Sequence, residues 1–296
     1  MENNLRSNSF IENMHIERLS RSPIIHPKLS STIGENVNGP SLIRAPPWID
    51  NPLAEYYLYF AHHKGDSIRL AYSNQLADKW NIYEGGTLQL ADSFFNDHIA
   101  SPDVHVDKEA RRVRMYYHGV TDNGQKTRVA TSSNGIDFEP RKPILGPYYF
   151  RVFEWEGEFY AFARDGAIYR SQDPFSKFAR GHELFEQMRH CAVDKAGDVL
   201  HVYYSNVGDA PERILRSHVT LEPRYKNWTA TPSETVLEPE YPYEGAGEQT
   251  GPSKPGPVYD SVRQLRDPDI FVEGEDKYLL YTVAGESGIA IAKIDE

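Results

Sequence analysis

A unit of four short strands recurs five times along the chain, and this repeat limits the possible folds more than any other feature of the sequence. Each unit is marked by a Tyr-rich strand, and the five are EYYLYFAHH (55–63), RVRMYYHG (112–119), EFYAFAR (158–164), VLHVYYS (199–205) and KYLLYTVAG (277–285). Each unit has roughly 40–60 residues, a repeat length typical of propeller blades. We therefore predict an all-β protein in which five blades surround a central axis.

The other strands of each unit are placed relative to the Tyr-rich strand. The innermost strands precede it, and they are GPSLI (39–43), SPDVHV (101–106), FRVFEW (150–155), RHCAV (189–193) and RDPDIFV (266–272). The third strands follow it and begin at Ser67, Lys126, Ala167, Arg213 and Gly288. The outermost strands are expected at Pro23–His26, Thr87–Leu90, Pro143–Gly146, Glu183–Phe185 and Thr235–Glu238.

The first outermost strand precedes all five units instead of following the third strand of its own unit. The fifth unit ends after three strands, while a spare outer strand in RSPIIHP (21–27), echoed by RKPILGP (141–147), lies near the N-terminus. Pairing of residues 22–27 with 288–294 would cover the free edge of the last blade. A β-sandwich also has evenly spaced strands, but it does not explain this displacement. The prediction is a five-bladed β-propeller whose last blade is closed by an N-terminal strand.

Two segments lie outside the repeat. Residues 1–20 are expected to form an N-terminal arm, partly helical over 11–19, before a single propeller domain over 21–296. Residues 238–262 are rich in Pro, Gly, Glu and Tyr and are inserted between the fourth and fifth units. A loop of this length is usually functional or disordered, so we expect a lid over one propeller face, with a solvated excursion as the alternative.

Composition excludes some classes of partner. The net charge of -11 argues against nucleic acid and anionic membranes. Residues 1–20 contain no continuous apolar stretch, so no signal peptide or transmembrane helix is expected and the cytoplasm is the expected location. The single cysteine, Cys191, excludes an internal disulfide and is expected in the core. The oligomeric state is not indicated.

Charged and polar residues gather at the starts of the innermost strands, which converge on one face of a propeller. They are Asn38, His98, Asp103, Arg151, Arg189, His190, Arg266, Asp267 and Asp269. Charged side chains are excluded from a narrow, partly buried channel unless they are paired or bind a ligand. The pattern predicts a pocket for a polar small molecule or oligosaccharide, with ion pairs between blades as the alternative.

Three motifs carry a resemblance to a known group of enzymes. They are RDPDIF (266–271), IRLAYSNQLADKW (68–80) and VATSSNGIDFEP (129–140). With the five-unit repeat, they resemble the furanosidase-type glycoside hydrolases of families 43, 32 and 68 and the related families 117 and 130. The resemblance implies two carboxylates on either side of a glycosidic bond, one as acid and one as nucleophile or base. The implied activity is that of a glycosidase acting on a small glycoside or oligosaccharide end.

The resemblance also implies particular residues. Asp267 matches the Asp of an Arg-Asp-Pro motif that stabilises the transition state in fructan-active families, and Asp103 matches an Ala-Pro-(Asp/Glu) pattern of family 43. Blade one departs from the group, because Gly39 stands where these families carry the Asp that is nucleophile or base. A relocated base is therefore expected, and family 117, thought to use a His as acid, is a precedent.

Two residues are the leading partners for Asp103. His190 lies beside Arg189 and is expected to have a pKa near neutral, and Glu244 is expected on the lid. The candidate catalytic residues are therefore Asp103, Asp267, His190 and Glu244. The candidate substrate-binding residues are Asn38, His62, His63, His98, His118, Arg151, Arg189 and Arg266.

No His-x-x-x-His or Cys-rich spacing indicates a zinc site, and no cofactor is expected to be required. A divalent ion held by histidines near the axis, or a Ca²⁺ or Na⁺ ion in the central channel, remains an alternative. Two other functions also remain open. One is a propeller enzyme that uses the pocket for elimination, isomerisation or cyclisation, and the other is a binding propeller without chemistry.

Overall fold

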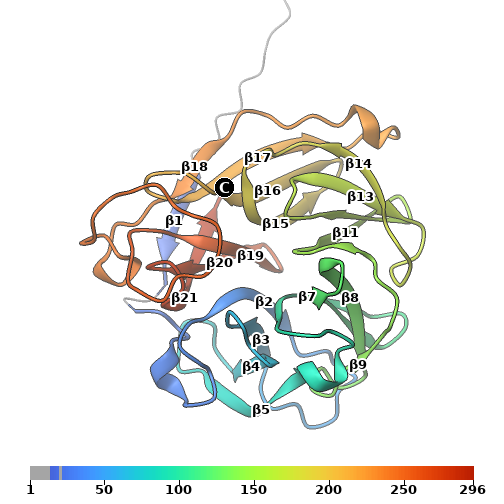
Figure 1. The fold of residues 1–296 in the computed structure, drawn as a ribbon, viewed down its shortest axis with the longest axis horizontal. Helices are drawn as coiled ribbons and strands as arrows, with labels where there is room; N and C mark the ends of the chain where they lie inside the picture. The colour runs from blue at the N-terminus through green and yellow to red at the C-terminus, as the bar shows by residue number, and fades with distance from the viewer. Residues whose placement is uncertain (1–13, 20–21) are drawn as a thin grey trace, which may run out of the picture.

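The computed structural model describes residues 14–19 and 22–296, and it confirms the five-bladed β-propeller (Figure 1). Blade one consists of β2 (Asn38–Arg44), β3 (Tyr56–Ala61), β4 (Ser67–Ser73) and β5 (Asn81–Gln89). Blade two consists of β6 (Ile99–Asp107), β7 (Arg112–Thr121) and β8 (Gly124–Ser132), with a split outer edge, β9 (Glu139–Pro140) and β10 (Gly146–Pro147).

The other three blades follow the same antiparallel order from the axis outward. Blade three consists of β11 (Arg151–Trp155), β12 (Glu158–Phe162), β13 (Ala167–Ser171) and β14 (Ala179–Glu183). Blade four consists of β15 (Met188–Ala196), β16 (Val199–Asn206), β17 (Ile214–Thr220) and β18 (Glu234–Leu237). Blade five consists of β19 (Arg266–Glu273), β20 (Asp276–Val283), β21 (Gly288–Asp295) and the N-terminal β1 (His15–Arg18).

The ring closes through an N-terminal strand, but not through the predicted residues. β1 pairs with β21, with His15 opposite Asp295 and Arg18 opposite Ala292. The predicted segment contributes only an isolated bridge between Ile25 and Ile289. The expected helix near residues 11–19 is wrong for its described part, because 15–18 are extended, and its first residues lie outside the described part of the chain. An unpaired edge on β21 favours the extended form.

Alternating residues of the Tyr-rich strands fill both gaps beside each blade. In β3, Tyr57 and Tyr59 pack toward blade two, while Leu58 and Phe60 pack toward blade five. Successive side chains of a strand point to opposite faces, so a strand between two neighbouring blades must be apolar on both. Each of the five gaps between neighbouring blades holds a hydrophobic cluster of described residues. This packing explains why the strands read as continuous apolar runs.

Three innermost strands begin with the same bulge. Gly39, Ser101 and Asp267 each precede a proline and have φ values of 55°, 47° and 46°. The strand register shifts at each of these three positions. Left-handed backbone is uncommon outside glycine and is retained where the surrounding structure fixes it. Beside these bulges, Asn38, Ala100 and Asp267 reach one mouth of the propeller.

Two residues further on, side chains link neighbouring blades in sequence. Asp269 accepts the backbone N–H of Leu42 at 2.9 Å, and Ser41 accepts that of Val104 at 2.9 Å. Asp103 accepts the backbone N–H of Val152 at 2.8 Å. These bonds satisfy buried backbone donors that no ladder partner reaches, so they hold the innermost strands of blades five, one, two and three in register.

Arg151 crosses the centre of the molecule. Its guanidinium is buried and donates to the carbonyl oxygens of Cys191 at 2.9 Å, Pro102 at 2.7 Å and Pro40 at 3.2 Å. These carbonyls belong to the innermost strands of blades four, two and one. Arg151 therefore supplies a positive charge to converging backbone dipoles. Among the described residues, no helix combines the length and apolarity needed to cross a membrane.

Candidate functional site

A cavity of about 380 Å³ lies at the mouth where the innermost strands begin, and side chains from all five blades line it. We call it the axial cavity. Its lining residues are Asn38, His63, Lys64, Asp97, His98, Ala100, His118, Gln125, Tyr148, Tyr149, Arg164, Arg189, Pro255, Gly256, Pro257, Asp267 and Glu286. Of the predicted site residues, it brings together Asn38, His63, His98, His118, Arg189 and Asp267.

Asp267 is a buried carboxyl in this cavity with few partners. Its Oδ2 lies 3.4 Å from the backbone nitrogen of Gly39, and its Oδ1 lies 3.9 Å from Nδ1 of His190. Burial, and then the nearby charge of Glu286, raise the pKa of Asp267 to about 6. A carboxyl with such a pKa is partly protonated near neutral pH, and it can give or take a proton.

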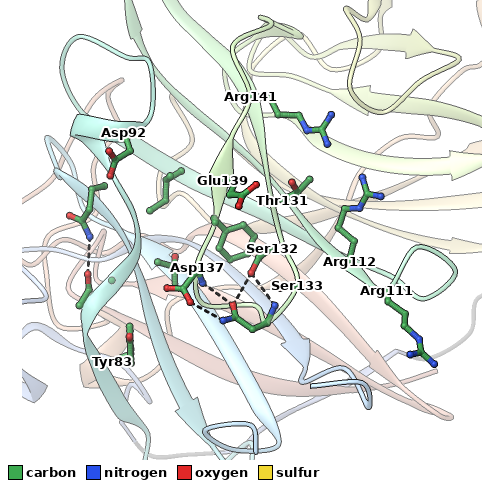
Figure 2. A pocket seen from close by; sticks show the side chains of 17 residues that line it. Tyr83, Asp92, Arg111, Arg112, Thr131, Ser132, Ser133, Asp137, Glu139 and Arg141 are labelled. Atoms are coloured by element: carbon green, nitrogen blue, oxygen red, sulfur yellow. Dashed lines mark hydrogen bonds between the residues drawn. The ribbon is translucent and has the colours of Figure 1, made fainter. Parts of the chain in front are cut away.

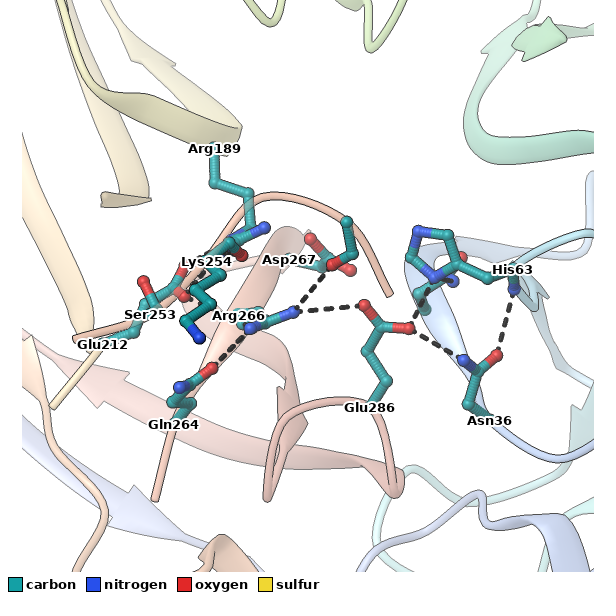
Figure 3. A network of polar contacts seen from close by, with 12 residues as sticks. Asn36, His63, Arg189, Glu212, Ser253, Lys254, Gln264, Arg266, Asp267 and Glu286 are labelled. Carbon is teal, nitrogen blue, oxygen red and sulfur yellow. Dashed lines mark hydrogen bonds and ion pairs between the residues drawn. The ribbon is translucent and has the colours of Figure 1, made fainter. Parts of the chain in front are cut away.

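Glu286, which follows β20, also lines the cavity and orients His63 there (Figure 3). Its Oε2 accepts hydrogen bonds from Nδ1 of His63 at 2.6 Å and from Nδ2 of Asn36 at 3.0 Å. Its Oε1 pairs with Arg266 at 3.3 Å. Nδ2 of Asn38 also lies 3.0 Å from Nδ1 of His63. When Nδ1 donates to Glu286, Nε2 is left as an acceptor, so the pair is arranged as an imidazole held by a carboxylate.

A second carboxylate neutralises the buried arginines behind the cavity (Figure 3). Glu212 accepts two hydrogen bonds from Arg189, at 2.6 and 3.0 Å, and it lies 3.2 Å from Nε of Arg266. Arg189 also donates to the carbonyl oxygen of Lys254 in the 238–262 segment. Arg266 is buried in this network and does not line the cavity. Bidentate pairs of this kind fix both side chains, so the network is a rigid wall.

A row of aromatic rings crosses the cavity. His118 lies 6.0 Å from His98 and 4.5 Å from Tyr149 between ring centroids, and Tyr149 lies 5.1 Å from His190. Burial lowers the pKa of His98, and it lowers that of His118 further, with help from neighbouring His98. These imidazoles are therefore neutral near pH 7. Nδ1 of His98 and Nδ1 of His118 have no hydrogen-bond partner among the described residues.

The expectation of a near-neutral pKa for His190 is wrong. His190 is buried behind Tyr149, and neither ring nitrogen has a hydrogen-bond partner in the described part of the chain. Burial, followed by the charge of Arg151, places the pKa of His190 well below the ordinary histidine range. The loss of hydration outweighs the attraction of the nearby carboxyls. His190 supports the cavity wall near Asp267 but does not line the cavity.

Asp103 does not share the cavity of Asp267, contrary to expectation. It lines a separate cavity of about 260 Å³ at the opposite mouth, with His105, Arg151 and Asp269. Burial alone would raise the pKa of Asp103, but the charge of His105, its hydrogen bond at 2.9 Å and then Arg151 lower it overall. The cause is the strand geometry, because Asp103 is two residues beyond Ser101 and so lies further along the axis.

Glu244 also lies away from the axial cavity. It is fully buried, and it accepts hydrogen bonds from Nε of Arg18 at 2.8 Å and from the hydroxyl of Tyr281 at 2.9 Å. The expected lid carboxylate is therefore one half of a buried ion pair at the outer side of blade five. A different part of the 238–262 segment, residues 255–257, reaches the cavity.

His62 points into a neighbouring surface pocket rather than the axial cavity. Its ring contacts the backbone positions of Gly34 and Gly65, and burial, then the charge of Arg69, lower the pKa of His62 to about 4. Arg151, the last of the predicted binding residues, lines only the opposite cavity. In the described chain, no three His, Cys, Asp or Glu side chains are grouped as a metal site.

Sequence reasoning missed Arg164, Lys64 and Glu286, which all line the axial cavity. Each lies just beyond the end of a second strand, β12, β3 or β20. These strand ends return to the same mouth as the starts of the innermost strands. The His62-His63 pair was predicted because it lies at the end of the second strand of blade one. The corresponding strand ends, after EFYAFAR and KYLLYTVAG, would have indicated Arg164 and Glu286.

Blade one cannot hold a carboxylate at the position of Gly39. A Cβ atom built there would lie 2.8 Å from the Cα atom of Ser101, closer than real Cβ atoms approach, whereas Asp267 holds a side chain at a similar φ value. The absence of an Asp at this position is therefore fixed by close backbone packing between blades one and two. Any acid–base chemistry in the cavity must use other groups.

A larger groove of about 770 Å³ lies on the outside of the ring between blades one and two (Figure 2). Within its lining, Asn134 bonds with Ser132 at 2.9 Å and with Asp137 at 2.8 Å. Arg111, Arg112 and Arg141 line it together with three carboxylates. It contains none of the predicted site residues.

No protein-family model matches the chain. An uncharacterized protein of Acanthamoeba polyphaga mimivirus is 34% identical over 297 residues, which cover 88% of this chain and 83% of that protein.

Solved structures of family-43 glycoside hydrolases share the fold. A thermostable family-43 glycoside hydrolase superposes with a TM-score of 0.60 at 15% identity, over 88% of this chain and 89% of its own. The GH43_1 enzyme from Xanthomonas citri complexed with xylose gives 0.60 at 12% identity, over 94% and 91%. The α-L-arabinanase of Cellvibrio cellulosa gives 0.56 at 13% identity, over 88% and 91%. At these identities the likeness shows the fold, and the expected glycoside-hydrolase-like propeller is confirmed at that level.

Proposed function

The chain belongs to the same family as its mimivirus relative, and we propose that it is a carbohydrate-active enzyme that cleaves a glycosidic bond in the axial cavity. The substrate is a small glycoside or the end of an oligosaccharide. The observation that carries the proposal is the pairing, in one cavity, of a protonatable carboxyl, Asp267, with the His63–Glu286 base.

The two groups have separate roles in the proposed reaction. Asp267 protonates the leaving glycosidic oxygen as the bond to the anomeric carbon breaks. His63 takes a proton from a water molecule, and the oxygen of that water bonds to the anomeric carbon. Glu286 holds the imidazole and stabilises the imidazolium that forms, and Arg266 in turn holds Glu286. Proton exchange with solvent restores both groups.

The test is turnover of a panel of aryl glycosides and oligosaccharides by Asp267→Asn, His63→Gln and the parent protein. General acid–base groups typically contribute about 10²–10⁴-fold, so each variant is expected to lose turnover within this range. Asp267→Asn should lose less on aryl glycosides with good leaving groups, which need no protonation, while His63→Gln should lose equally on all. His105→Gln, at the opposite mouth, is the control with unchanged turnover. Absence of turnover by the parent, or normal turnover by both variants, would contradict the proposal.

The packing at Gly39 favours one second candidate, a non-hydrolytic acid–base reaction such as elimination or isomerisation. A protonated carboxyl and a carboxylate-held imidazole can also remove a proton from carbon and return one elsewhere. Product masses distinguish the two reactions, because hydrolysis adds one water and isomerisation adds none. Solvent deuterium incorporated at carbon would support the second candidate.

A further inference from the structure

The axial cavity contains two cations that no carboxylate neutralises. Arg164, after β12, and Lys64, in the turn after β3, both line it. Nη1 of Arg164 donates to the carbonyl oxygen of Met188 at 2.7 Å. Within the described chain, neither cation has a carboxylate oxygen within 4.0 Å. Both charges are therefore available to a ligand.

Two carboxylates in and behind the cavity are already shared by other groups. Glu212 is shared by Arg189 and Arg266, and Glu286 is shared by Arg266 and His63. Asp267 forms no close ion pair with an arginine. Asp97 also lines the cavity, but it is largely exposed and its closest cationic neighbour is Nδ1 of His98 at 3.6 Å. Arg164 and Lys64 therefore have no carboxylate partner among the described residues.

We propose that the substrate carries an oxyanion, a carboxylate or a phosphate, which Arg164 and Lys64 bind. The planar guanidinium of Arg164 has donors in a fork that matches either group, and Lys64 adds a mobile point charge. The neutral histidines and Asn38 provide donors and acceptors for sugar hydroxyls, because Nδ1 of His118 and Oδ1 of Asn38 have no partner among the described residues. This inference rests on the proposed function only for placing a sugar in this cavity.

Because the whole protein is negatively charged, binding of an anionic sugar requires local cations such as Arg164 and Lys64. A net charge of -11 repels anions at long range, so an anionic sugar must be recognised by cations at short range. Contacts between partly exposed charges weaken as salt rises, because the Debye length falls to about 8 Å at physiological ionic strength. Binding of the charged sugars should therefore weaken with added salt, while binding of neutral sugars should not.

The test is calorimetric binding of glucuronate, galacturonate, glucose 6-phosphate and galactose 6-phosphate, with glucose and galactose as neutral probes. At least one charged sugar should bind about 10-fold more tightly than its neutral parent, and its identity separates a carboxylate from a phosphate. Hydrogen bonds to charged groups contribute enough for Arg164→Gln and Lys64→Gln each to lower that affinity about 10-fold. Arg164→Lys should recover part of the loss, and Arg111→Gln, on the outer groove, should lose nothing.

Equal affinity for charged and neutral sugars, no binding of any charged probe, or unchanged affinity in a folded Arg164→Gln protein would overturn the inference. Equilibrium binding requires no turnover, so failure here is separable from failure of the proposed function. Selective binding of charged sugars without hydrolysis would contradict the proposed function alone. Hydrolysis of neutral glycosides without a preference for charged ones would contradict this inference alone.

Discussion

At the scale of residues, two aspartates of one strand have similar acidity and face different cavities. Asp267 and Asp269 are both buried on β19, and the pKa of each is raised to about 6. Burial is the main cause for both. Asp267 lines the axial cavity, where we propose that it transfers a proton, and Asp269 lines the opposite one, where it accepts the N–H of Leu42. In our proposal, the same pKa has a catalytic role in Asp267 and a structural role in Asp269.

Asp269→Asn should increase stability at neutral pH and leave activity unchanged. The folded pKa of Asp269, about 6, lies above its unfolded value, so the folded state binds more protons between about pH 4 and 6 and loses stability as pH rises. A rise in the pKa of Asp269 from 3.8 to about 6 corresponds to about 3 kcal/mol of stability. The amide removes this cost and still accepts the Leu42 N–H. Urea unfolding from pH 4 to 8 should show a gain for the variant that grows with pH. A gain that is constant, or that grows toward acid, would show that Asp269 is not the titrating group.

At the scale of elements, β1 closes the ring and also ties down the inserted segment. Arg18 of β1 pairs with Glu244 and donates to the carbonyl oxygen of Glu238 at 3.0 Å. Glu244 also accepts backbone N–H groups from Glu240 and Tyr241. One strand therefore pairs the edge of blade five and neutralises a buried carboxylate of the 238–262 segment. Ring closure and the position of this segment depend on the same arginine.

Arg18→Ala should destabilise the protein by about 3 kcal/mol, because it leaves the charge of Glu244 buried without its partner. Arg44→Ala is the matched control, since its ion pairs with Glu55 and Glu273 are much more exposed and should contribute less than about 1 kcal/mol. Urea unfolding at pH 7 measures both. Equal losses in the two variants would show that the Arg18–Glu244 pair behaves as a surface pair.

The strands were predictable because their pattern repeats, and the site was predictable only where it follows the repeat. Asp267 and Arg189 were predicted because each lies at the start of an innermost strand. Asp103 was misplaced because two residues along a strand separate the two mouths, and composition does not show which mouth a side chain faces. Glu244 was misplaced because its partner, Arg18, is distant in sequence and no local pattern connects them. Ion pairs across a closed ring depend on the complete fold.

At the scale of the whole molecule, the axis has two separate ends. Arg151 lies between them and binds backbone carbonyls of three blades. One end holds Asp267, the His63–Glu286 pair and the unpaired cations, and the other holds Asp103, Asp269 and the bonds that join the innermost strands. We propose that the first end carries the chemistry and that the second end holds the blades together.

The most direct test compares kcat/KM of Asp267→Asn and Asp103→Asn on the best substrate of the parent protein, with thermal unfolding of both. The account predicts a loss of at least about 10²-fold for Asp267→Asn with an intact fold. For Asp103→Asn it predicts nearly normal kcat/KM and a lower melting temperature, because His105 and Arg151 lose a charged partner. Normal turnover by Asp267→Asn, together with loss of turnover by a well-folded Asp103→Asn, would place the chemistry at the opposite end and contradict the account.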